Sequence, residues 1–215
     1  MRKRFFEVGK HCAEVPRKSD VREYCTMTRR ISLAWGDLAM HEPSRDEIDR
    51  HAEELSRAYN DPKNAALLGH VAEIDPDGVV EHYVDLVGEG GHPVMLFLDG
   101  TLAGDGDLRG VTNGAAELAF LIAAPNAQGK GLGTRFALML AYAGFRVLDL
   151  ERVYASVAPQ NVASIRVFEK LGFWIVDDPE ARSFADEPED VVFLIDRAAF
   201  DRLHGETVAL WEPTR

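Results

Sequence analysis

The chain has 215 residues, of which 46% are hydrophobic, and a formal net charge of −12 at pH 7. This length allows one domain with a sizeable core, and the negative charge argues against a nucleic-acid partner, because phosphate backbones attract clustered Lys and Arg. A cationic substrate fits the charge better, although a charge of this size also serves solubility.

Helical periodicity dominates the chain before residue 90. It predicts helices over Val21 to Leu33, Ser44 to Tyr59 and Asp77 to Val87. Ser44 stands at the N-cap of the second helix, with Glu47 three residues on in capping-box register. No internal repeat, low-complexity segment or linker divides the chain, so we expect a single domain.

Strands are predicted from residue 94 onward. Asp99-Gly100 stands between two apolar runs, Val94 to Leu98 and Thr101 to Leu108, and predicts a hairpin. The elements predicted after it are a strand from Glu117 to Ala123, a helix beginning near Leu132, a strand from Val153 to Val157, a helix beginning at Asn161, and strands from Phe173 to Val176 and from Val191 to Ile195. This order predicts an α+β fold, or an α/β fold, in which helices are layered on a sheet.

A glycine-rich segment, Gln128-Gly129-Lys130-Gly131-Leu132-Gly133, connects a predicted strand to a predicted helix. Glycines let the backbone approach an anion closely and adopt positive φ. The N–H groups at the start of the helix and the positive end of its dipole also favour negative charge. The segment therefore predicts a phosphate-binding turn, to which Arg135 adds positive charge.

Other patterns argue against a membrane or a metal. The longest apolar stretch, Phe136 to Phe145, is shorter than the roughly 20 residues that span a bilayer. Cys12 and Cys25 are too few for a disulfide framework and lack CxxC spacing, so we expect reduced thiols in the cytoplasm. The histidines form no HxxxH or HExxH pair, so we expect no metal site.

The segment from Asn161 to Phe173 reads as a short capped helix that stops at a glycine and runs into a strand. Together with the glycine-rich turn it resembles the acetyl-CoA half of the GNAT N-acetyltransferase superfamily. The segment Leu150 to Val157 resembles the branch that includes ribosomal-protein N-terminal acetyltransferases and polyamine acetyltransferases. The resemblance is close over residues 115–176 and nearly absent before residue 90.

The resemblance implies a mixed, twisted sheet whose central strands splay apart to admit acetyl-CoA. It implies one GNAT-like domain over residues 1–215, with the acetyl-CoA-binding core at 93–200 and a helix-rich acceptor-side elaboration at 1–92. The implied reaction is direct attack of a primary amine on acetyl-CoA, without a covalent enzyme intermediate or a metal. The amine is a small molecule or a peptide N-terminus. Homodimer formation is compatible with the chain, although no residue pattern predicts it.

Acetyl-CoA offers a pyrophosphate and a pantetheine arm rich in amides. Backbone N–H groups of the glycine-rich turn would bind the pyrophosphate, and a strand end would pair with the amides as an added β-strand does. The positions predicted for these contacts are Leu121, Ile122, Ala123, Gln128, Gly129, Lys130, Gly131, Leu132, Gly133 and Thr134. Asn161 matches a cofactor-contacting position of the family, although helix capping explains it equally well. From Glu117 to Gln128 the chain is one residue longer than many relatives, which a bulge would absorb.

Catalysis needs a base for the amine and an acid for the leaving thiolate. Glu117 is the predicted base, acting directly or through water. The alternative is a solvated strand-end carboxylate. On the cofactor side, Phe168 stands where many relatives have a tyrosine, and a phenyl ring cannot donate a proton. The candidate acids are therefore Ser164 and Tyr154, with helix capping and packing as their structural alternatives.

The remaining predictions concern acidic residues and alternative functions. Asp105 and Asp107 alternate on a strand and are expected on a solvated face, with contact to a cationic substrate as the alternative. The acidic run from Asp177 to Asp190 is expected to be a hydrated loop, which in this family lies near the acceptor. A non-catalytic acyl-CoA-binding module is the alternative function. An unrelated nucleotide-binding protein is disfavoured, because GxxxxGK[ST] and GxGxxG are both absent.

Overall fold

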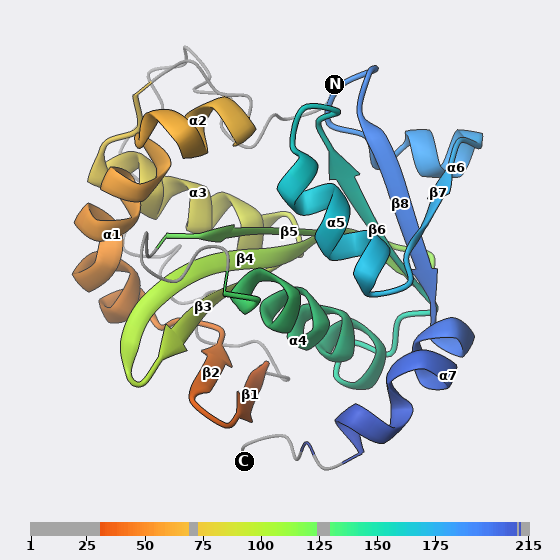
Figure 1. Ribbon diagram of the computed structural model, residues 1–215. Coiled ribbons are helices and arrows are strands. Elements are labelled where there is room, and N and C mark those ends of the chain that lie inside the picture. The colour runs from red at the N-terminus through yellow and green to blue at the C-terminus, as the bar shows by residue number, and fades with distance from the viewer. Residues whose placement is uncertain (1–30, 69–72, 124–129, 210, 212–215) are drawn as a thin grey trace.

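The computed structural model describes residues 31–68, 73–123, 130–209 and 211. Within them an eight-stranded sheet has the order β1-β2-β3-β4-β5-β6-β8-β7 (Figure 1). The strands are β1 (Ser32–Trp35), β2 (Leu38–His41), β3 (His92–Leu98), β4 (Thr101–Thr112), β5 (Ala115–Ile122), β6 (Arg152–Val157), β7 (Trp174–Val176) and β8 (Val191–Asp196). The helices are α1 (Arg45–Tyr59), α2 (Pro62–Leu68), α3 (Pro76–Gly88), α4 (Leu132–Arg146), α5 (Val162–Lys170), α6 (Pro179–Arg182) and α7 (Arg197–Val208). Neighbouring strands are antiparallel except β5 and β6, which are parallel, so the mixed α+β sheet predicted from the sequence is confirmed.

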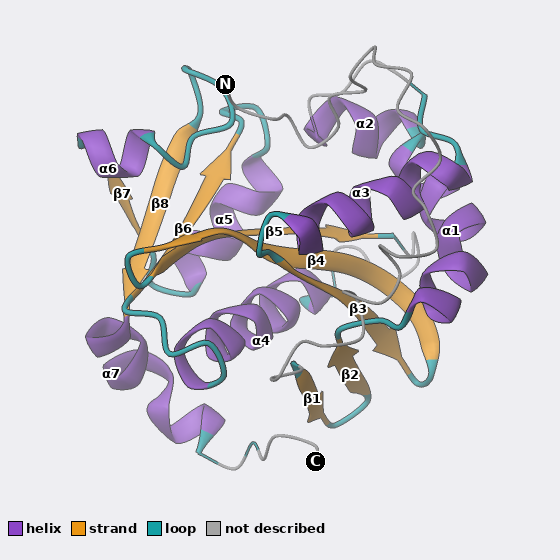
Figure 2. Cartoon of the chain, turned by 180° about the vertical axis from the view of Figure 1, so that it is seen from behind, coloured by secondary structure: helices purple, strands orange, loops and turns teal. Residues whose placement is uncertain are grey.

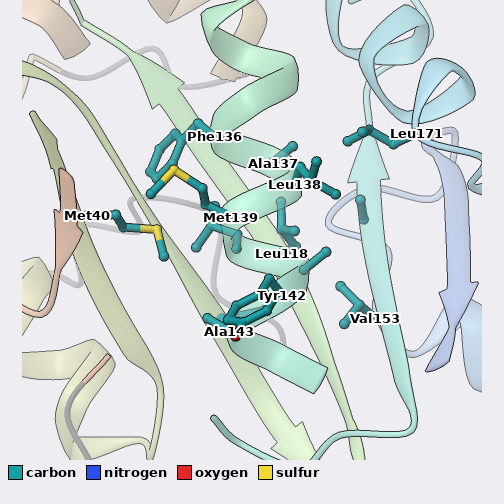
Figure 3. Close-up of a cluster of buried hydrophobic side chains, with 14 of the residues drawn as sticks. Met40, Leu118, Phe136, Ala137, Leu138, Met139, Tyr142, Ala143, Val153 and Leu171 are labelled. Atoms are coloured by element: carbon teal, nitrogen blue, oxygen red, sulfur yellow. The ribbon is translucent and has the colours of Figure 1, made fainter. Parts of the chain in front are cut away.

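The helices cover both faces of the sheet. On one face α4 buries its apolar side against Leu118 of β5 and Val153 of β6, in the cluster that Figure 3 shows in part. Seen from behind, α1 and α3 lie on the opposite face (Figure 2), where Tyr59 and Tyr83 pack with Leu121. Because side chains alternate along a strand, the central strands are buried on both faces. None of the helices in the described ranges is long and apolar enough to cross a bilayer.

The predicted capping box at the start of α1 is confirmed. Ser44 Oγ accepts a hydrogen bond from the Glu47 backbone N–H at 3.3 Å, and Glu47 Oε2 accepts one from the Ser44 N–H at 2.8 Å. The helix predicted over Asp77 to Val87 is also present, as α3. These features follow from residues a turn apart, which is why the sequence alone predicts them.

Removing the cap should weaken the fold by a modest amount. We expect Ser44→Ala to lower the free energy of unfolding by about 1 kcal/mol, because the first turn of α1 loses a side-chain acceptor. Urea denaturation followed by circular dichroism measures this. Ser44→Asp keeps a capping oxygen and should retain the stability, and equal losses in both variants would contradict a capping role.

The helix predicted over Val21 to Leu33 is wrong where the structure describes it. Residues 21–30 lie outside the described ranges, and Leu33 belongs to β1. β1 turns through Gly36, at φ +63°, into β2, which pairs with β3. The region before residue 90 therefore contributes strands to the sheet as well as helices. Strands this short carry little periodicity, and pairing of β1 with β2 and of β2 with β3 decides their conformation.

Candidate functional site

The two central strands, β5 and β6, separate part of the way along their length. They pair only where Ala115 to Glu117 lie beside Arg152 to Tyr154. Past that point a cavity of about 340 Å³ lies between Ala119 and Phe120 of β5 and Ser156 of β6. The splay expected from the sequence is thus present, and Glu117 lies at its closed end.

The backbone of β5 directs alternate groups into this gap. A Cβ on Gly106 would lie 2.5 Å from the carbonyl oxygen of Ala119, and one on Gly104 would lie 2.2 Å from that of Leu121, so both carbonyls face β4. The N–H of Ala123 likewise donates to Ala103 of β4 at 2.9 Å. Since backbone direction alternates along a strand, the main-chain groups of Leu118 and Phe120 face β6.

This alternation decides which of the three predicted pantetheine contacts direct main-chain groups toward the gap. Leu121 and Ala123 direct main-chain groups to β4, whereas Ile122 has the opposite direction. The register of β5 with β4 is continuous from Glu117 to Ile122, so the expected bulge is absent from that stretch. Separate irregularities of the register occur in β4, next to Phe97 of β3 and after Arg109.

The start of α4 has the features of an anion site. Gly131 is its N-cap residue with φ +82°, and a Cβ added there would meet no atom within 4 Å. No side chain caps this end of the helix in the described residues, so the first N–H groups, from Leu132 to Thr134, are directed outward. Gly133 lies against β5, where a Cβ would come 3.3 Å from the Phe120 ring. A pyrophosphate therefore fits the backbone here.

The charged residues near this turn differ in their roles. Lys130 is exposed beside the helix start. Arg135, expected to add charge, forms an ion pair with Asp37 at 2.5 Å and donates to the Trp35 carbonyl at 2.8 Å. Its guanidinium thus ties the β1–β2 hairpin to α4. The predicted contacts Gln128 and Gly129 lie outside the described residues.

Helix α5 forms a second wall of the cavity. Asn161 Oδ1 accepts a hydrogen bond from the Ser164 N–H at 3.1 Å, so Asn161 caps the helix and also lines the cavity. Ser164, in the first turn of α5, also lines the cavity. Phe168 adds an apolar surface, packed edge-on against Phe120 with 6.2 Å between ring centroids.

Glu117 is buried, with 6% of its surface exposed, so the alternative of a solvated strand-end carboxylate is wrong. Burial raises the pKa of its carboxyl group well above the usual range, and the charge of Asp186 raises it further. The Arg109 guanidinium and the Ser156 backbone act in the opposite direction. A carboxyl group with a raised pKa at the end of a cleft is suited to accept a proton near neutral pH.

The expectation that Asp105 and Asp107 lie on a solvated face is also wrong, because helices cover both sides of β4. Asp107 accepts two hydrogen bonds of 2.5 Å from Arg109. Asp105 Oδ2 accepts from the hydroxyls of Tyr59 and Tyr83, the latter at 2.9 Å. Burial raises the pKa of Asp105 to about 6. Alternation along the strand cannot distinguish a covered face from a solvated one.

The loop before β8 supplies an acidic wall, which we define as the cavity-lining residues Asp186, Glu187, Glu189 and Asp190. Ser156 Oγ donates to Asp190 Oδ2 at 2.8 Å and accepts from the Asp186 N–H at 3.0 Å, so the loop is fixed to β6. None of the described residues that line the cavity is Lys, Arg or His. The cavity is therefore suited to a cationic guest.

Tyr154 is not brought to the cavity. Its ring is buried and stacks on Phe184 with 4.4 Å between centroids, and the residue is absent from the cavity lining. Glu180 lies near its hydroxyl and raises its pKa, after the larger effect of burial. Of the predicted catalytic residues, Ser164 lines the cavity and Glu117 lies buried at the closed end of the gap.

Comparison with known proteins matches residues 45–174 to the family described as "Acetyltransferase (GNAT) domain". Spermidine N(1)-acetyltransferase of Escherichia coli (strain K12) is 43% identical over 53 residues, which are 25% of this chain and 28% of that protein. The human protein named alpha/beta-tubulin-N-acetyltransferase 9 is 40% identical over 67 residues, 31% of each chain. The matches thus span less than a third of these curated relatives.

Solved structures resemble the chain over most of its length. An aminoglycoside acetyltransferase in complex with coenzyme A superposes with a TM-score of 0.60 at 24% identity, covering 72% of this chain and 94% of that one. Mycobacterium smegmatis RimJ in complex with CoA-disulfide gives a TM-score of 0.64 at 16% identity, covering 84% and 91%. At these identities the likeness concerns the fold.

Proposed function

The chain belongs to the GNAT acetyltransferase family, and from this premise we propose that it transfers the acetyl group of acetyl-CoA to a primary amine by direct attack. The observation that carries the proposal is the gap between β5 and β6, which has the buried carboxyl group of Glu117 at its closed end. The gap would hold both the thioester of acetyl-CoA and the amine that attacks it.

The donor site follows from the backbone. The open N-terminus of α4 at Gly131 would hold the pyrophosphate, with Lys130 beside it. The main-chain groups of Phe120 that face β6 would pair with a pantetheine amide. Asn161 and Phe168 would contact the arm from α5.

The chemistry uses the two predicted residues at the gap. Bound acetyl-CoA supplies the thioester carbonyl that an amine attacks. Glu117 takes a proton from the amine, directly or through water, and its raised pKa makes it a competent acceptor. Ser164 donates a proton to the departing sulfur and regains one from water, to which Glu117 returns its own. The C–N bond forms as the C–S bond breaks, and the products are an amide and a free thiol.

The acceptor we favour is a small cationic amine. The acidic wall and the formal charge of −12 both attract cations. Among similar proteins, the Escherichia coli relative is named for spermidine and a structural neighbour for aminoglycosides. A peptide N-terminal amine is the alternative acceptor, and the human relative is named for a protein, tubulin.

The proposal is tested by calorimetric titration with acetyl-CoA and by thiol release against polyamines, aminoglycosides and short peptides. Turnover on one class would support the proposal and identify that acceptor class. Binding of acetyl-CoA without thiol release on any class would favour the alternative, a non-catalytic acyl-CoA-binding module, which the phenyl ring of Phe168 motivates. Absence of binding would overturn the assignment.

Ser164→Ala tests the proton donor without disturbing the helix cap, because the cap uses the backbone N–H of Ser164. We expect kcat to fall by about tenfold at neutral pH, since a thiolate with an ordinary thiol pKa leaves with little assistance. Steady-state kinetics measure this. An unchanged kcat would mean that the sulfur takes its proton from water.

Two sequence-based expectations stay predictions. The homodimer is checked by light scattering after size-exclusion chromatography. A cytoplasmic location is checked by fractionation of cells that express the chain.

A further inference from the structure

Asp186 lies where the cavity and the buried carboxyl group of Glu117 meet. It is partly buried and belongs to the acidic wall. Glu117, by contrast, is almost fully buried and is absent from the residues that line the cavity. Asp186 is therefore the more accessible of the two groups to a molecule in the cavity.

Ser156 contacts both Glu117 and Asp186. Glu117 pairs in register with Tyr154, and Ser156 follows two residues later on the same face of β6. The Ser156 backbone faces the Glu117 carboxyl group, and Ser156 Oγ accepts the hydrogen bond of 3.0 Å from the Asp186 N–H. The same hydroxyl donates a hydrogen bond of 2.8 Å to Asp190 Oδ2. Ser156 thus contacts the Glu117 carboxyl group through its backbone and the main chain of Asp186 through its hydroxyl.

The surrounding charges favour a pair that holds a proton. From β4, Arg109 lowers the pKa of both carboxyl groups and Asp107 raises both. Within the loop, Asp190 and Glu187 raise that of Asp186. Burial is the largest cause in each case, and it acts against two negative charges side by side.

We propose that Asp186 is a second catalytic carboxylate, which binds the acceptor amine at the cavity wall and shares with Glu117 the proton that the amine releases. This inference rests on the proposed acetyltransferase function. An ammonium group that becomes an amide loses two protons: one ends on the sulfur of coenzyme A, and the other passes through Asp186 to the pair and then to water. No oxidant, metal or covalent enzyme intermediate is needed.

Asp186→Asn should lower kcat/KM for the amine by about 100-fold, with acetyl-CoA affinity unchanged. It should also move the ascending limb of the pH profile to lower pH. The sign follows because the base acts when deprotonated, and removing the negative charge of Asp186 lowers the pKa of Glu117. A merely structural role in the loop would not move that limb.

Two further variants make the test specific. Asp186→Glu keeps a carboxylate and should restore both the rate and the limb, which guards against a folding defect in the Asn variant. Asp177→Asn removes an exposed carboxylate between β7 and α6, paired with Arg182 at the surface, and should leave the kinetics unchanged.

The double variant Glu117→Gln with Asp186→Asn should be little slower than Glu117→Gln alone, because residues that act as a unit are not additive. Additive losses, or an unmoved pH limb, would overturn this inference and leave the proposed function standing. A wild-type protein that transfers acetyl to no amine would overturn both.

Discussion

Glu117→Gln is expected to lower kcat by about 10³-fold while the affinity for acetyl-CoA stays the same. The amide side chain keeps the shape of glutamate but cannot accept a proton from the amine. The cofactor contacts lie elsewhere, at the start of α4 and on α5, so they should not change. Steady-state kinetics and calorimetry on the same preparation measure the two quantities.

The same substitution should make the folded protein more stable at neutral pH. The pKa of Glu117 is raised in the folded state above its ordinary value of 4.5, so the folded protein loses stability as pH rises from that value through the raised pKa. A neutral Gln avoids this loss. A variant that is both slow and more resistant to urea would show that the site, and not the fold, is impaired.

Glu206→Gln serves as the control. Glu206 is an exposed carboxylate on α7, far along the chain from β5 and β6, which form the gap. It should change neither kcat nor stability by a measurable amount. If Glu117→Gln kept its full rate, the assignment of Glu117 as the base would be wrong.

Gly131→Glu is expected to weaken acetyl-CoA binding by about 10³-fold. A carboxylate some 4 Å from the pyrophosphate would cost about 4 kcal/mol near a protein surface, which corresponds to that factor in Kd. The side chain would project into the space where a Cβ now meets no atom within 4 Å. Calorimetric titration with acetyl-CoA measures the effect.

Gly90→Glu is a matched control for the backbone strain of this change. Gly90 also has positive φ, +81°, and a Cβ there meets no atom within 4 Å, but it lies in the turn between α3 and β3. Both substitutions should cost comparable stability, and only Gly131→Glu should weaken acetyl-CoA binding. Equal affinities in the two folded variants would falsify the pyrophosphate site at α4.

Local signals explain what the sequence determined. The capping box at Ser44, the hairpin at Asp99-Gly100 and the cap of α5 at Asn161 each depend on residues within a turn of one another. The glycine at 131 likewise requires positive φ for a local reason. Steric and hydrogen-bonding preferences over a few residues suffice to fix such caps and turns. The donor half and Glu117 were predicted from the resemblance of residues 115–176 to the GNAT family.

Only the tertiary structure decided which polar residues are buried and which of them lie close to the gap. Asp105 and Asp107 became buried because α1 and α3 cover their face of the sheet. Tyr154 stacked on Phe184, and Asp186 reached the gap because Ser156 holds its loop. Each outcome depends on contacts between residues that lie 22 or more positions apart. Periodicity shows that a face exists, but the element that covers it is determined by packing across the whole chain.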